Sequence, residues 1–248
     1  MERGSFYKVV REQILRGIQS GVLRPGEKLP SERFLCDELA LNRNTVRHAL
    51  LMLQREGKIF RLERKGWYVS TVRLIYNPAN HVNFARLASS QGMQVHWTTE
   101  DHGVLVVGKS IEIDGDEGFP EGASVYKMEN TYFLDEQKVA FIITYLLADR
   151  LQGIVPKTVS RAMTQVIEEE YGVTLVQRNL LIRPLLLSKE VTSVLGISHG
   201  SPGIYVRRIK TDGTDCVLTV EHEYWRFDAI ELRVDADVRN DRILDEMK

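Results

Sequence analysis

The sequence predicts a two-domain α+β protein, with an N-terminal winged helix-turn-helix and a C-terminal domain built on an antiparallel sheet. Within the first 70 residues, segments with helical spacing of apolar residues precede two short alternating segments. The charge is divided: residues 1–73 carry 15 Lys and Arg against 8 Asp and Glu, and the remainder carries 18 against 26. Beyond residue 83, long alternating runs outnumber helical segments, which is typical of α+β domains.

The composition is that of an ordinary globular chain. Its 248 residues, 43% hydrophobic and 27% charged, suit one or two domains. No apolar run approaches the roughly 20 residues that span a bilayer, and the N-terminus has no apolar signal core, so we expect a cytoplasmic protein with no membrane partner. Cys36 and Cys216 are too few and too far apart for a disulfide scaffold or a zinc site, and are expected to be core thiols.

The helix boundaries of the N-terminal domain carry recognisable signals. A first helix ends near Gly21, and Pro25-Gly26 forms a turn. Ser31 can cap a second helix, and Glu32 suits the positive end of its dipole. A third helix over residues 43–56 ends at Gly57, and residues 59–62 and 67–70 alternate like two strands of a hairpin.

The rest of the chain is predicted to form a linker and a second domain. Residues 1–73 are assigned to the winged helix-turn-helix domain, residues 74–82 to a linker, and residues 83–248 to the sheet-containing domain. The expected strands are residues 104–113, 125–134, 138–146, 180–187, 203–211 and 216–227, and the expected helices are residues 82–91, 159–171 and 188–195.

The third helix has the character of a DNA recognition helix. Arg43, Asn44 and Arg47 share its exposed side, and Arg can donate bidentately to guanine or to phosphate. One such arginine is more commonly a solvated charge, but the helix order, the turn and a basic wing tip together predict contact with duplex DNA. The candidate DNA-binding residues are Ser31, Glu32, Arg33, Arg43, Asn44, Thr45, Arg47, Lys65 and Gly66.

Residues 6–70 resemble the N-terminal domain of GntR-type regulators. That family has a PG turn, LPSER, a helix of the type SRxTVRxAL, EGxI and a glycine-tipped wing, and this chain has LPSERFL, NRNTVRHALLML, REGKI and KGWYV. One departure is Lys65-Gly66-Trp67, where many members carry Gly-x-Gly-Thr. The resemblance implies a bacterial transcription regulator.

The C-terminal part resembles the effector domain of the HutC-like subfamily (the UTRA domain), whose fold is related to chorismate lyase. The resemblance rests on NF at residues 83–84, EYGV at 170–173, LGI at 195–197 and EYWRFD at 223–228. Within that subfamily the chain is most similar to regulators of phosphonate utilisation. The resemblance therefore implies a small, anionic effector, with 2-aminoethylphosphonate first.

The residues at the positions that bind an anionic group in the subfamily are different in this chain. Asn130 and Tyr132 stand where the family often has Arg-x-Arg, and Ile142 stands in place of a frequent glutamate. Compensating charge must then come from another arginine, for which the candidates are Arg161, Arg178, Arg183 and Arg207. The expected effector-binding residues are Asn83, Asn130, Tyr132, Ser160, Arg161, Arg207 and Tyr224.

Catalytic and metal motifs are absent from the sequence. It contains no Gly-x-Ser-x-Gly, P-loop or His-Glu-x-x-His, and its histidines are scattered, so no catalytic residue, metal or cofactor is expected. Glu221 and Glu223 share one strand face, where a solvated or salt-bridged pair is the ordinary interpretation.

These observations predict a non-enzymatic regulator, a homodimer that binds a palindromic operator and responds to a small molecule. A lyase-like enzyme tethered to a DNA-binding head is an alternative that rests on fold resemblance alone. An architectural DNA-binding protein without a ligand is a third.

Overall fold

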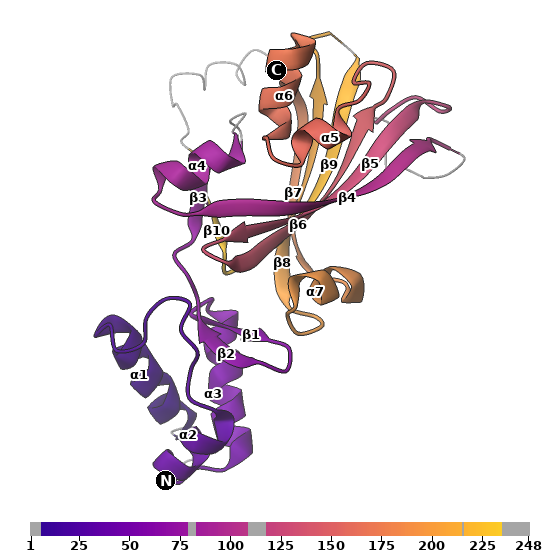
Figure 1. The fold of residues 1–248 in the computed structure, drawn as a ribbon. Helices are drawn as coiled ribbons and strands as arrows, with labels where there is room; N and C mark the ends of the chain where they lie inside the picture. The colour runs from indigo at the N-terminus through magenta and orange to yellow at the C-terminus, as the bar shows by residue number, and fades with distance from the viewer. Residues whose placement is uncertain (1–5, 79–82, 109–117, 215, 235–248) are drawn as a thin grey trace, which may run out of the picture.

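The computed structural model of the chain describes residues 6–78, 83–108, 118–214 and 216–234, which form two bodies placed end to end (Figure 1). A winged helix makes the N-terminal body, and an antiparallel sheet with flanking helices makes the C-terminal body. The predicted fold class is therefore confirmed. Within the described ranges, no helix is both long and apolar enough to cross a membrane.

The N-terminal body, the head, is held by one apolar core. Its elements are α1 Phe6–Gln19, α2 Glu32–Leu39, α3 Arg43–Arg55, β1 Ile59–Leu62 and β2 Gly66–Val69. Ser31 and Asn42 cap α2 and α3, because each side-chain oxygen accepts the backbone N–H three residues further on, at 3.1 and 2.9 Å. Periodic apolar residues of the helices and hairpin meet in the core: Val10, Ile14, Leu29, Leu35, Val46, Ala49, Leu50, Leu53, Ile59, Trp67 and Val69.

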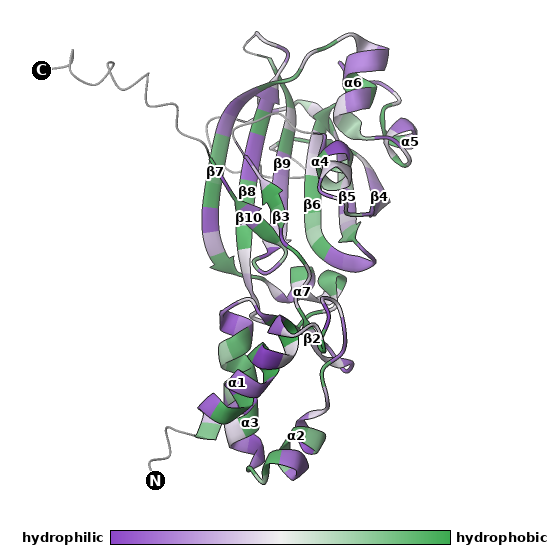
Figure 2. Cartoon of the chain, turned by 90° about the vertical axis from the view of Figure 1, so that its left-hand side faces the viewer, coloured by the Kyte–Doolittle hydropathy of each residue, from purple (hydrophilic) through white to green (hydrophobic). Residues whose placement is uncertain are grey.

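A six-stranded antiparallel sheet forms the C-terminal body, in the order β4-β5-β6-β9-β8-β7. The strands are β4 Val95–Val106, β5 Ser124–Leu134, β6 Gln137–Leu147, β7 Val176–Leu186, β8 Pro202–Thr211 and β9 Val217–Arg226. Side chains alternate between the two faces of the sheet. Figure 2 shows this as alternating hydrophilic and hydrophobic bands along β7 and β8.

Different helices cover the two faces. On one face, here called the cavity face, lie α4 Phe84–Ser90, α5 Val155–Thr158 and α6 Met163–Tyr171. They pack against side chains such as Met128, Tyr132 and Trp225. On the opposite face, α7 Lys189–Leu195 packs against Phe141 and Tyr224.

Some boundaries differ from the sequence prediction. Strand β4 begins at Val95 instead of residue 104, and its expected continuation from residue 109 lies outside the described residues. As an edge strand it is exposed over most of its length, so no apolar alternation marks its start. The helix expected over residues 159–171 begins four residues later, as α6 at Met163, and a separate short helix, α5, precedes it with Pro156 in its first turn.

The expected linker at residues 74–82 contains a strand. β3 Leu74–Tyr76 pairs in parallel with β10 Ile230–Leu232, and residues 79–82 lie outside the described part of the chain. Leu74 is fully buried beside Trp225 in the core of the C-terminal body. The chain therefore joins the sheet domain directly after Arg73, since the pairing partner of β3 comes from the far end of the sequence.

The two bodies touch through the wing. The backbone N–H of Glu63 donates to the carbonyl of Gly196 at 3.0 Å, and Leu62 forms an isolated bridge with Ile197. Figure 2 shows α7 beside the hairpin. The hairpin that should face DNA is thus also in contact with the effector domain.

Candidate functional site

A basic groove lies between the start of α2, the start of α3 and the wing. Six cationic side chains and one carboxylate line it. It contains six of the nine predicted DNA-binding residues, namely Ser31, Glu32, Arg33, Arg43, Lys65 and Gly66, and adds Lys28, Arg61 and Arg64. Such an excess of positive charge suits the phosphate backbone of DNA.

The exposed face of α3 carries the remaining predicted residues. Arg43, Asn44 and Arg47 are exposed, with the side chain of Arg43 76% accessible. Thr45 is partly buried, and its hydroxyl donates to the capping oxygen of Asn42 at 3.1 Å. Thr45 therefore helps begin the helix, whereas the two arginines and Asn44 are available to a ligand.

Glu32 holds the groove together. Its carboxylate accepts hydrogen bonds from Trp67 Nε1 at 3.1 Å and from Arg43 Nε at 3.3 Å. Burial alone would raise the pKa of Glu32, but these hydrogen bonds and the charges of Arg47 and Arg61 bring it below its ordinary value. The ionised carboxylate thus ties α2, α3 and the wing into one surface.

The wing adds two cations to the groove that are not among the predicted DNA-binding residues. Arg64 has φ +59° and Gly66 has φ +104°, so the turn needs left-handed backbone at both positions. The guanidinium carbon of Arg61 lies 5.6 Å from the centre of the Trp67 ring, and both side chains line the groove. Two features of the sequence could have identified these residues: Arg61 lies on the alternating segment that forms β1, and Arg64 is next to Lys65 at the basic tip of the wing.

A second site is a cavity on the cavity face of the sheet, with about 690 Å³ of unfilled space, its open mouth included. It lies between α4, the start of α6 and the central strands. Its lining combines aromatic, aliphatic and charged side chains: Tyr76, Phe84, Ala85, Trp97, Tyr132, Ile142, Ala162, Met163, Thr164, Arg208, Lys210, Glu221, Glu223 and Trp225. This mixture of apolar surface and a few polar groups suits a small metabolite.

Two buried ion pairs cross the cavity wall from β8 to β9. Arg208 Nε lies 2.5 Å from Glu223 Oε1, and Lys210 Nζ lies 2.7 Å from Glu221 Oε1. The antiparallel register places Arg208 opposite Glu221, so each cation reaches a carboxylate diagonally across the hairpin. The salt-bridged interpretation of Glu221 and Glu223 is therefore confirmed, but the pair is buried.

These contacts set the protonation of the cavity wall. Burial would raise the pKa of Glu221, but the charges of Lys210 and Arg208 and a hydrogen bond from Thr219 bring it below its ordinary value. Burial, with a smaller effect of Glu221 and Glu223, raises the pKa of Tyr132 well above that of a free phenol. At neutral pH, Glu221 is thus an ionised acceptor and Tyr132 a neutral phenol.

Only some predicted effector-binding residues lie at this cavity. Tyr132 lines it, and Asn130 stands on the same sheet face opposite the lining residue Ile142. Asn130 donates to Thr99 Oγ1 at 3.1 Å, and its buried Oδ1 has no hydrogen-bond partner among the described residues. Asn83 caps α4 by accepting the N–H of Arg86.

The other predicted residues lie elsewhere. Arg207 and Tyr224 point to the opposite face, because their neighbours Arg208 and Glu223 point to the cavity and side chains alternate along a strand. Arg161 pairs with two glutamates of α6, and Ser160 is exposed beside it.

Arg208 is the arginine that lines the cavity, and none of the four candidate arginines of the sequence prediction does. Arg178 is exposed, and the guanidinium of Arg183 lies 4.8 Å from the Tyr205 ring on the opposite face. The signal that could have located Arg208 is the hairpin around Gly213. In that hairpin, Arg208 and Lys210 lie two residues apart on one strand. Two glutamates, also two residues apart, lie on the other strand, so all four side chains point to the same face of the sheet.

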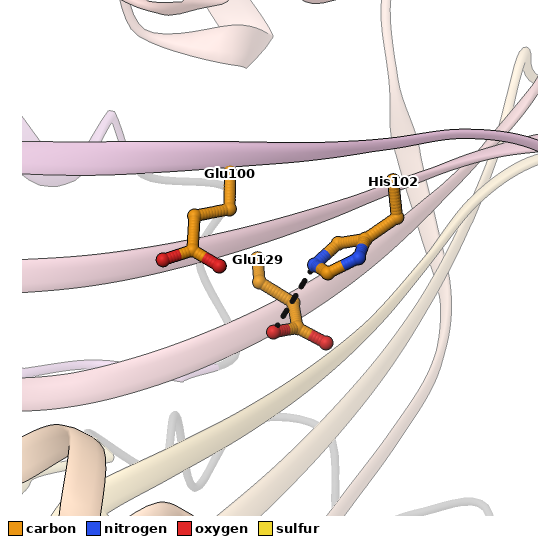
Figure 3. A group of neighbouring side chains, drawn as sticks. All are labelled: Glu100, His102 and Glu129. Atoms are coloured by element: carbon orange, nitrogen blue, oxygen red, sulfur yellow. Dashed lines mark ion pairs between the residues drawn. The ribbon is translucent and has the colours of Figure 1, made fainter.

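A third cluster, of Glu100, His102 and Glu129, lies on the opposite face (Figure 3). His102 Nε2 is 3.2 Å from Glu129 Oε2, and Lys127 Nζ is 2.7 Å from Glu129 Oε1. Since Lys127 already supplies a positive charge to Glu129, these side chains form an ion-pair network. The expectation that the chain holds no metal stays a prediction.

Strand β9 runs from the cavity to the head. Beyond the cavity residue Trp225, Arg226 binds Asp228 through Nη2–Oδ2 at 2.6 Å and lies 3.8 Å from the Phe60 ring of β1. Asp228 also accepts a hydrogen bond from Ser70 of the head at 3.2 Å. We call Arg226, Asp228, Phe60 and Ser70 the interdomain clamp.

Comparison with known proteins agrees with this arrangement. Each of the two domains matches a family model. Residues 6–69 match the model described as 'Bacterial regulatory proteins, gntR family', and residues 90–231 match the model of the UTRA domain. The uncharacterized HTH-type transcriptional regulator YihL of Escherichia coli (strain K12) is 30% identical over 232 residues, which are 93% of this chain and 98% of the relative.

More distant relatives show the same organisation. The HTH-type transcriptional repressor NagR of Bacillus subtilis (strain 168) is 23% identical over 202 residues, 82% of each chain. The crystal structure of PhnF from Mycobacterium smegmatis has a TM-score of 0.63 at 22% identity, over 93% of this chain and all of that one, and so shares the fold. The chain therefore belongs to the gntR family of bacterial regulatory proteins and is a transcriptional regulator whose winged helix is followed by a UTRA effector domain.

Proposed function

We propose that this regulator binds a palindromic operator as a homodimer, and that a small polar effector in the cavity changes its affinity for DNA. The observation that carries the proposal is the continuity of β9. One strand lines the cavity with Glu221, Glu223 and Trp225, and then contacts the head through Arg226. Occupation of the cavity can therefore alter the position of the wing.

The DNA contacts follow from the basic groove. Helix α3 enters the major groove with Arg43, Asn44 and Arg47 facing base edges and phosphates. The wing cations Arg64 and Lys65 reach the adjacent backbone or minor groove. Glu32 acts as a positioning residue, because its carboxylate holds Arg43 and Trp67.

Effector response requires two arrangements of the head that differ in their contacts. The interdomain clamp and the Leu62–Ile197 bridge hold the wing against the sheet domain in the arrangement seen here. A ligand that displaces Glu223 or Trp225 would shift the end of β9 and with it Arg226. A coupling of about 1–3 kcal/mol between effector and operator is the usual range.

Dimerisation is assigned to the domain after residue 75. A single small head would bind one half-site weakly, and joining two heads raises affinity through effective concentration. The edge strand β7 exposes apolar side chains on both faces of the sheet, Leu181 on one and Leu186 on the other, so a second copy that pairs along this edge could cover both. A chain ending at Arg73 should then bind full operator much more weakly than the whole protein.

An enzymatic role has no support from the cavity. A general acid there would need a raised pKa, whereas that of Glu221 is lowered and Glu223 is bound by both Arg208 and Trp225. The effector role is therefore the better proposal. The effector expected from the sequence is an anion, with 2-aminoethylphosphonate as the first candidate. To bind such an anion, Arg208 and Lys210 would have to break their ion pairs with Glu223 and Glu221.

The test begins with selection of operator sequences from random duplexes by the full-length protein. We expect an inverted repeat, a dimer on the DNA by light scattering, and an operator affinity that changes when a metabolite fraction is added. A single half-site bound by a monomer would contradict the dimer model. If no metabolite changes the operator affinity, the alternative of an architectural DNA-binding protein without a ligand is the better explanation.

A further inference from the structure

We infer that the cavity takes an uncharged, polyhydroxylated ligand of carbohydrate type, and that it discriminates against phosphorylated and other anionic compounds. This rests on the proposed function, because it names the ligand class of the effector cavity. Three features of the cavity wall carry the inference: its aromatic surface, its charge balance and the hydrogen-bonding groups that remain free.

The aromatic surface is continuous. Phe84 lies between Tyr132 and Trp225, with ring centroids 5.0 and 5.4 Å away, and Trp97 lies 5.8 Å from Tyr132. Tyr76 extends the group at 6.4 Å from Trp225. Flat aromatic faces pack well on the C–H face of a pyranose ring, while the ring hydroxyls bind polar groups at its edge.

The charges of the wall sum to zero. Arg208 and Lys210 are balanced by Glu221 and Glu223, and no other charged side chain is found in the lining among the described residues. A phosphate dianion placed here would add uncompensated negative charge next to two carboxylates in a poorly solvated site. Such burial is costly without a matching cation.

Arg208 has little capacity left for an anion. Its Nε donates to Glu223, its Nη1 to the carbonyl of Pro78 and to Gln177, and its Nη2 to the Tyr76 hydroxyl. Because four bonds already engage all three nitrogens of the guanidinium, it cannot offer the bidentate fork that grips phosphate. Arg208 therefore holds the segments of the cavity wall together and is not available to bind an anion.

Lys210 and Glu221 provide the free groups. Lys210 Nζ has Glu221 Oε1 as its hydrogen-bond partner, and that oxygen also accepts from Thr219 at 3.2 Å. Within the described ranges, Glu221 Oε2 and the other N–H groups of Lys210 have no partner. A hydroxyl can accept from the ammonium and donate to the carboxylate at once, so neighbouring hydroxyls of a sugar satisfy both without separating the pair.

The test is calorimetry on the full-length protein with four uncharged sugars: D-glucose, D-galactose, D-fructose and N-acetyl-D-glucosamine. Each is compared with its 6-phosphate, and 2-aminoethylphosphonate and L-lysine represent ligands of net negative and net positive charge. We expect at least one sugar to bind, and its phosphate to bind about tenfold more weakly or worse. Failure of every sugar at millimolar concentration, or tighter binding of a phosphate or of L-lysine, overturns the inference.

Two variants test the individual features. Trp97→Leu removes an aromatic wall and should weaken sugar binding by about tenfold or more. Glu221→Gln leaves Lys210 without its counter-charge and should strengthen binding of the 6-phosphate by about tenfold. Glu100→Gln, on the opposite face of the sheet, is the matched control and should change neither. Unchanged binding in both cavity variants, with melting temperatures near that of the parent protein, also overturns the inference.

Operator binding separates this inference from the proposed function. If an anion or L-lysine changes operator affinity and no sugar does, the ligand class is wrong and the regulator proposal stands. If the protein selects no operator, the regulator proposal fails whatever the cavity binds.

Discussion

Arg43 offers a sharp test of how the head meets DNA. It is the first residue of α3, its side chain is largely exposed, and its Nε lies 3.3 Å from Glu32 Oε2. Arg43→Ala removes the cation while keeping a strong helix former. Glu32 keeps its hydrogen bond from Trp67, and an exposed ion pair contributes at most about 1 kcal/mol, so the head should remain folded.

The size of the effect depends on what Arg43 contacts. A base-edge contact should cost about 1–3 kcal/mol, or roughly 5- to 150-fold in operator affinity, and should relax specificity at one base pair. A phosphate contact should weaken binding to all sequences and lower the slope of log affinity against log salt by about 0.9. Arg47→Ala should behave in one of these two ways as well.

Fluorescence anisotropy with selected operator, measured over a series of salt concentrations, distinguishes the two cases. Arg55→Ala is the matched control, because it removes the same charge from the same helix about 18 Å further along the axis. Its affinity should stay near that of the parent protein. Unchanged affinity and unchanged salt slope in both Arg43→Ala and Arg47→Ala would refute the placement of α3 in the major groove.

Other predictions concern the interdomain clamp and the buried ion pairs. Ser70→Ala removes the hydrogen bond from the head to Asp228 without disturbing the buried Arg226–Asp228 pair, and should leave ligand binding intact while reducing the ligand's effect on operator affinity; an undiminished effect would exclude the clamp as the connection. Glu223→Ala leaves Arg208 buried without its counter-charge and should lower the free energy of unfolding by about 3–5 kcal/mol in denaturant titrations. Because the pKa of Glu221 is lowered in the folded protein, its contribution to stability is present at neutral pH and is lost as pH falls below the ordinary glutamate value of about 4.3. Glu221→Gln should therefore flatten the acid limb of the stability profile, and an unaltered limb would contradict this assignment.

The two candidate sites differed in how far sequence reasoning could reach. Six of the nine predicted DNA-binding residues line one groove, because helix caps, a short turn and a hairpin place them within about 40 residues of one another. Of the effector residues, Tyr132 lines the cavity and Asn130 lies beside it, whereas Arg207 points away. A shift of one residue along a strand moves a side chain to the other face of the sheet.

The sequence by itself determined the winged helix, the division into two domains and most strands of the sheet, because these follow from local periodicity, capping and turn residues. Only the tertiary structure decided which charged residues share the cavity, that β3 pairs with β10 across most of the chain, and that β9 connects the cavity to the wing. Contacts between distant segments depend on sheet order and register. Neither is encoded in the spacing of residues along one strand.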